Sequence, residues 1–101
     1  MAITAALVTA LGGGNIDYVP ITPSARDFKV TLPAGTWLVQ IEASSSDSSK
    51  SSTATAGGVG SMVPPGSSVL LTRVVSGGTL TGSTDNYKLN YTHGIAIRLG
   101  D

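Results

Sequence analysis

The stretch DFKVTLPAGTWLVQIEA, residues 27–43, decides the fold. Large apolar side chains alternate with polar ones in residues 28–32, and the alternation resumes in residues 37–43, after the segment PAGT. A period of two predicts β-strands with one buried face. Pro33 and Gly35 suit a tight turn, because proline fixes φ and glycine accepts a positive φ. The stretch predicts a hairpin that turns at residues 33–36 and places Leu32 opposite Trp37.

Residues 69–75 form a second apolar stretch that does not alternate cleanly. Val69, Leu71 and Val75 would point to one face of a strand, whereas Leu70 and Val74 would point to the other. Both faces are therefore expected to be dry. Either the domain itself covers the second face, or a partner protein does.

The C-terminal stretch, residues 87–99, has a long period of two. Its odd positions are aromatic or aliphatic except for His93, so one strand, or two strands broken near His93 and Gly94, should bury the odd face. Clusters of turn-forming residues at 12–15, 76–79 and 81–86 separate the apolar stretches. The sequence predicts an all-β fold, an antiparallel β-sandwich that is jelly-roll-like or immunoglobulin-like.

Length and charge limit the classes of protein to consider. A chain of 101 residues has the length of one domain. Six basic residues balance six acidic ones, and only 12% of residues are charged, so nucleic acid is not an expected partner. A weakly charged surface offers little protection against association, which favours a homo-oligomer or a larger assembly. Cysteine is absent, which excludes disulfides and thiolate chemistry.

The first eleven residues, MAITAALVTAL, are apolar but lack a basic start and are about half the ~20 residues that span a bilayer. We interpret them as part of the fold, not as a membrane segment. Ile3, Leu7 and Leu11 would share one helical face, and the odd positions also suit a strand, so both structures stay open. Residues 1–14 could equally form an arm that is exchanged between subunits.

A serine-rich tract occupies residues 44–60. Seven of the nine residues from 44 to 52 are serine, and only Asp47 and Lys50 in the tract are charged. Serine and glycine bury too little apolar area to offset the entropy cost of ordering. The tract is therefore expected to be a long solvated loop or a polar edge strand at the rim of the domain.

The sequence contains no pattern typical of a catalytic or metal site. His93 is the only histidine, and metal sites built on imidazole usually combine at least two such donors. The acidic residues are scattered, and no GxSxG or phosphate-loop pattern occurs in a suitable context. We predict that the protein is not an enzyme, has no cofactor or metal, and places His93 at a rim.

The hairpin FKVTLPAGTWLVQIEAS, followed by a loop of small residues and a closing GIAIRLG strand, resembles small β-sandwich modules of bacteriophage virions. The resembling families are head decoration or cement proteins and the jelly-roll ends of tail fibres. The resemblance implies a virion protein without enzymatic activity. It also implies a homo-oligomer, often a trimer, that binds the major capsid protein and stabilises the head.

Two functional hypotheses follow from the resemblance and the residues. The first is a capsid decoration subunit that makes contacts through leftover apolar side chains, namely Ile3, Leu7, Leu11, Leu38, Leu70 and Val74. The second is a receptor- or carbohydrate-binding module of a phage fibre, which would need an exposed aromatic platform. Candidates for that platform are Trp37, Tyr18, Tyr87 and Tyr91, although the position of Trp37 beside Val39 and Ile41 favours the core.

Overall fold

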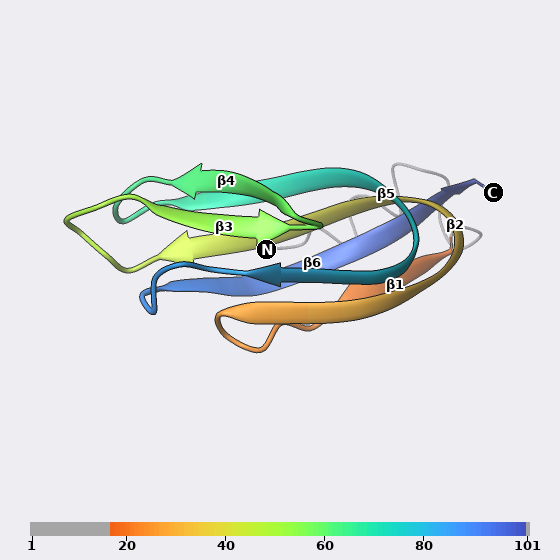
Figure 1. Cartoon of the computed structure of the whole chain (residues 1–101), viewed down its shortest axis with the longest axis horizontal. Helices are drawn as coiled ribbons and strands as arrows, with labels where there is room; N and C mark the ends of the chain where they lie inside the picture. Colours follow the sequence, from red (N-terminus) through yellow and green to blue (C-terminus); the bar gives the residue numbers. More distant parts are fainter. Residues whose placement is uncertain (1–16, 101) are drawn as a thin grey trace.

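The computed structural model describes residues 17–100, which form strands joined by loops (Figure 1). This part of the chain contains no helix long and apolar enough to cross a bilayer. The strands are β1 (Tyr18–Ile21), β2 (Asp27–Ser45), β3 (Ser52–Ala56), β4 (Val59–Val63), β5 (Ser68–Ser83) and β6 (Leu89–Gly100).

The strands pair antiparallel, as the sequence predicts, and the main pairs are nested. β3 pairs with β4. β2 and β5, which flank this hairpin in the sequence, pair with each other, and β1 and β6, which flank all four, form the outermost pair. β6 also pairs with β2, which joins the outermost pair to the next one. The all-β antiparallel fold is confirmed.

The predicted hairpin at residues 33–36 is wrong. β2 runs through this segment as one strand and pairs with β5 on both sides of it, with Leu32 opposite Gly78 and Thr36 opposite Ser76. The segment is a bulge at which β2 bends, and β5 bends with it at the same end of the molecule (Figure 1). Gly35 does have a positive φ, of 135°, but it serves this bend instead of a chain reversal.

The shared bend makes the two layers of the sandwich. In the β6 layer, β1, β6, residues 36–45 of β2 and residues 68–76 of β5 lie side by side. In the β3 layer, residues 27–32 of β2, residues 78–83 of β5, β3 and β4 lie side by side. Gly57, directly after β3, donates a hydrogen bond from its backbone N to Thr81 O of β5 at 2.9 Å.

The core lies between the layers and uses the alternating side chains of residues 27–43. Trp37 is 1% exposed, so its interpretation as a core residue is confirmed. Tyr91 packs edge-on against Phe28, with ring centroids 5.0 Å apart, and its hydroxyl donates to the carbonyl oxygens of Thr55 and Ser83. Burial raises the pKa of Tyr91 above its ordinary value. The core members are Ile21, Phe28, Leu32, Trp37, Val39, Ile41, Ala43, Ala54, Ala56, Val63, Leu71, Leu80, Leu89, Tyr91 and Ala96.

The predicted single buried face of residues 87–99 is wrong at Tyr87, which precedes β6 and is exposed, and again beyond residue 91. Ala43 faces Tyr91, whereas Glu42 faces His93, so Thr92 is an extra residue that forms a bulge. A bulge of one residue reverses which side chains face inward. Leu89 and Tyr91 point into the core, but Ile95 and Ile97 point to the outer side of the β6 layer.

The serine-rich tract divides into three parts. Residues 44–45 end β2, residues 46–51 form a loop, and residues 52–60 belong to the β3–β4 hairpin, which ends at Val63. Ala54 and Ala56 are fully buried and Ser52 nearly so, because small side chains allow β3 to approach the core closely. The expectation of a solvated tract is therefore wrong for β3, while β4 does lie at the edge of the β3 layer.

Candidate functional site

Three of the predicted contact residues share the outer face of the β6 layer. Leu38 on β2 lies opposite Val74 on β5, and Leu70 lies opposite Glu42 two outward-facing rows further along the strands. Leu70 is 39% exposed, Val74 is 65% exposed and Leu38 is half-buried. Leu71 faces the core, so the side chains of β5 divide between two faces as the sequence predicts. Because Leu70 and Val74 are exposed, the domain itself does not cover the second face at these positions, and a partner there stays a prediction. The other three, Ile3, Leu7 and Leu11, lie outside the described residues.

Sequence reasoning missed two residues of the same face. Ile97 lies opposite Leu38, and Ile95 lies opposite Gln40, so both belong to the surface that carries Val74. The sequence pattern does not reveal the bulge at Thr92, and without that bulge a strict period of two assigns both isoleucines to the core. His93 is on this face too, opposite Glu42, and is partly buried.

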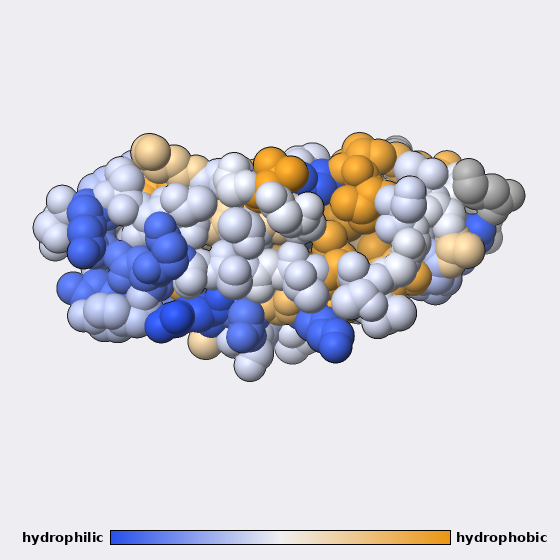
Figure 2. Space-filling model, in the orientation of Figure 1, coloured by the Kyte–Doolittle hydropathy of each residue, from blue (hydrophilic) through white to orange (hydrophobic). Residues whose placement is uncertain are grey.

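The opposite side of the molecule also carries apolar surface. On the side shown in Figure 2, apolar residues gather over the half that contains the bends. Hydrophilic residues gather at the other end, where the loops of residues 46–51 and 84–88 lie. Each end of the molecule therefore offers a different kind of contact.

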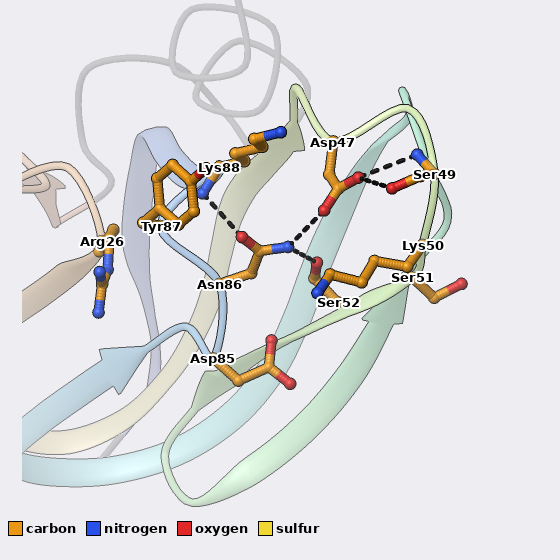
Figure 3. A pocket seen from close by; sticks show the side chains of 10 residues that line it. All are labelled: Arg26, Asp47, Ser49, Lys50, Ser51, Ser52, Asp85, Asn86, Tyr87 and Lys88. Atoms are coloured by element: carbon orange, nitrogen blue, oxygen red, sulfur yellow. Dashed lines mark hydrogen bonds between the residues drawn. The ribbon is translucent and has the colours of Figure 1, made fainter.

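A polar pocket of about 640 Å³ lies at this hydrophilic end (Figure 3). It is formed by the loop at residues 46–51, the first residue of β3, the loop at residues 84–88 and Arg26, which directly precedes β2, so distant parts of the chain meet in it. Its lining residues are Arg26, Asp47, Ser49, Lys50, Ser51, Ser52, Asp85, Asn86, Tyr87 and Lys88.

Asp47 organises one wall of the polar pocket. One carboxylate oxygen, Oδ1, accepts hydrogen bonds from the backbone N of Ser49 at 2.9 Å and from the Ser49 hydroxyl at 2.8 Å. The other, Oδ2, accepts from Asn86 Nδ2 at 2.9 Å, and the same nitrogen donates to the Ser52 hydroxyl (Figure 3). Asp47 is buried, yet every one of these contacts favours its charged form.

The hydrogen bond from the Ser49 backbone, followed by that from Asn86, holds the pKa of Asp47 well below its usual range. We expect the free energy of unfolding to fall as the pH is lowered below about 3.9, because the unfolded carboxylate then binds a proton more readily than the folded one. The stabilisation that ionised Asp47 contributes is fully present above that pH, and it is lost as the pH falls toward the pKa of Asp47 in the folded protein. Urea unfolding at pH 6, 4 and 3 measures it.

The variant Asp47→Asn is expected to show a shallower loss of stability between pH 4 and 3 than the unchanged chain. Asp27→Asn is a matched control, since the Asp27 side chain is exposed and outside the Asp47 network. Identical slopes for Asp47→Asn and the unchanged chain would contradict the assignment.

The polar pocket is suited to binding more than to catalysis. Asp47 is held ionised by its donors, so it is a poor proton donor, and Asp85 Oδ1 accepts a hydrogen bond from the backbone N of Thr53. Tyr87 is 70% exposed at the rim, with Lys88 Nζ 5.7 Å from its ring centroid. Such a rim can stack on a planar or sugar ring and offer charged hydrogen-bond donors.

Of the predicted aromatic platform, only Tyr18 and Tyr87 are exposed, whereas Trp37 and Tyr91 are buried. Within residues 17–100 no three His, Cys, Asp or Glu side chains are close enough to hold a metal ion together. No protein-family model, no curated protein and no solved structure matches the chain, so its function is argued from these surfaces.

Proposed function

We propose that the protein is a structural virion component, a decoration or cement subunit that binds a major capsid protein and stabilises the head. The observation that carries this proposal is the outer face of the β6 layer, to which Leu38, Leu70 and Val74 all point and on which Leu70 and Val74 are exposed. Exposed apolar side chains clustered on one face favour a protein partner.

The strand arrangement supports the same class of protein. Each half of β2 and of β5 counts as one segment, which with β1, β3, β4 and β6 makes eight segments in two layers of four. We infer a jelly roll, since this architecture has eight strands in two sheets and occurs in viral capsid and lectin domains. The architecture alone does not assign a function, so the proposal also depends on the exposed face.

The subunit would stabilise the head by adding contacts between capsid proteins. A subunit seated across a joint between capsid proteins adds buried area to that joint, and binding to the assembled state alone shifts the equilibrium toward it. A specific contact of about 800 Å² on each partner is sufficient. Among the described strands, residues 68–76 of β5 also form an edge of the β6 layer, and a strand edge can be extended by a strand of another protein.

The experiment compares binding to purified capsids that lack the subunit. Val74→Lys and Leu70→Lys are expected to weaken co-sedimentation with capsids at least about tenfold, because each places a charge in an apolar contact. Met62→Lys, which changes an exposed side chain of β4 on the other layer, is the matched control. Equal binding of all three variants, or no binding by the unchanged chain, would refute the proposal.

The native mass in solution tests the proposed trimer. A trimer is expected. A trimer or a dimer would agree with self-association of the protein. A stable monomer at the concentrations of the capsid assay would contradict the homo-oligomer.

The alternative function is a carbohydrate- or receptor-binding module of a fibre. The polar pocket favours it, since Tyr87 is exposed beside Lys88, Lys50 and Asp85. Glycan-array binding that is lost in Tyr87→Ala and retained in Tyr18→Ala would support this function over shell binding. Both variants remove an exposed tyrosine, so the comparison isolates the pocket.

A further inference from the structure

Half of the basic residues of the chain line the polar pocket. Of its six lysines and arginines, Arg26, Lys50 and Lys88 lie there, and we call these three the pocket cations. Among the described residues of the lining, the acidic ones are Asp47 and Asp85. The whole chain carries no net charge, so the excess of positive charge is local. A local excess suits a small anionic group, whereas a long polyanion needs a wide basic surface.

The pocket cations keep their donors for a ligand. Within residues 17–100 none of them forms an ion pair with a carboxylate. Other basic side chains have partners, since Arg98 pairs with Asp17 at 3.4 Å. Arg73 donates to backbone carbonyl oxygens, including that of Val59 at 3.1 Å. The basic residues outside the pocket are thus partly committed to the fold, whereas those of the pocket can bind an anion.

The two carboxylates of the pocket leave room for an anion. Both oxygens of Asp47 accept hydrogen bonds and the residue is 3% exposed, so its charge is directed into the loop and not into the open space. Asp85 is exposed, and its Oδ1 accepts from the backbone N of Thr53 at 2.8 Å. Its other oxygen, Oδ2, can accept a hydrogen bond from a ligand hydroxyl.

Tyr87 adds a flat apolar surface beside these charges. Its side chain is 70% exposed, and Lys88 Nζ lies 5.7 Å from the centre of its ring. Lys50 extends from its own loop toward the loop of residues 84–88 (Figure 3). An exposed aromatic ring between cations suits a ligand that has both a ring to pack on the tyrosine and a negative charge.

We propose that the polar pocket binds a sugar ring that carries an anionic group, either a carboxylate or a phosphate. The ring packs on Tyr87, the anionic group lies at Lys50 and the other pocket cations, and a ring hydroxyl donates to Asp85. The volume of about 640 Å³ is within the range of small-molecule sites, about 300–1,000 Å³. This inference rests on the alternative function, glycan binding in the pocket, and it is independent of capsid binding through the outer face of the β6 layer.

NMR titration of the ¹⁵N-labelled full-length chain tests the ligand class. The probes are galactose, galacturonate and galactose 6-phosphate, which share a sugar ring and differ in charge. The amide signals of residues 46–51 and 84–88 are expected to shift, with affinities at least about fivefold higher for the acidic probes than for galactose. The acidic probe that binds more tightly identifies the anionic group. An ionic strength of about 1 M, where the screening length is about 3 Å, is expected to remove the difference.

Variants separate the charge from the ring surface. Lys50→Gln is expected to lower the affinity for the acidic probes about threefold or more and to leave that for galactose unchanged. Lys29→Gln, at an exposed lysine of β2 outside the pocket, is the matched control. Tyr87→Ala is expected to weaken the binding of all three probes, because it removes the packing surface and keeps the cations. Equal affinities of the two lysine variants for the acidic probes would contradict the role of Lys50.

Three other results would overturn the inference. Equal affinities of the unchanged chain for galactose and for the acidic probes would leave glycan binding in place but remove the need for an anionic group. Acetate or inorganic phosphate that binds as tightly as the acidic sugars would show a site for bare anions. The absence of any shift would contradict glycan binding as well. None of these results affects the capsid assay, which depends on Leu70 and Val74.

Discussion

Trp37→Ala is expected to lower the free energy of unfolding by about 3–5 kcal/mol, a large part of the 5–15 kcal/mol that stabilises a typical domain. Trp37 is buried at the start of the second half of β2, directly after the bend. Its indole Nε1 donates to the Pro33 carbonyl oxygen at 2.8 Å, so the side chain fills the core and also holds the bend. Urea unfolding followed by far-UV circular dichroism measures the change.

Trp37→Phe separates the two contributions. It keeps an aromatic ring in the core but leaves the Pro33 carbonyl without its donor, which is expected to cost about 1–3 kcal/mol beside any loss of packing. A loss below about 1 kcal/mol for Trp37→Ala would show that Trp37 does not stabilise the bend or the core.

Gly77→Ala is expected to destabilise the protein by about 3 kcal/mol or more, the upper range for overpacking. A Cβ atom at this position would lie 2.1 Å from the Pro33 carbonyl oxygen and 2.8 Å from the Ala34 Cα. Both atoms belong to the backbone of the bend in β2, so no side-chain rotation relieves the contact. The two bent strands must separate, which opens the end of the sandwich.

Gly100→Ala is the matched control, since a Cβ atom there would meet no heavy atom within 4 Å. It is expected to change the free energy of unfolding by no more than about 0.5 kcal/mol. Equal stability of Gly77→Ala and Gly100→Ala, measured by urea unfolding, would show that β2 and β5 tolerate a wider spacing at the bend.

Alternation predicts the buried faces correctly wherever a strand is regular. Leu32, Trp37 and Ile41 are buried as their spacing requires, and Leu70 and Val74 point outward. Local chemistry cannot decide between a hairpin and a bend at residues 33–36, because both use a proline and a glycine with positive φ. The bend forms because β5 places Gly77 and Gly78 opposite the bulge, where Gly77 leaves room for the backbone of β2.

The polar pocket and the outer face of the β6 layer depend on pairings that are distant in the sequence. Asp47 and Asn86 are 39 positions apart, and only the ends of β2 and β6 bring them together. The serine-rich composition around Asp47 predicts a loop but does not identify its hydrogen-bond partners. The bulge at Thr92 likewise results from pairing with β2, so the sequence does not reveal that Ile95 and Ile97 face outward.

The nested pairing of the strands has a consequence for how the chain folds. The β3–β4 hairpin has the shortest connection and can form first, because closing a short loop costs the least entropy. Its formation brings Ser44 near Ser68, so β2 and β5 can then zip outward to Asp27 and Ser83 without a separate long-range search. Pairing of β1 with β6 comes last in this order, which makes the outermost pair the one most exposed to transient opening.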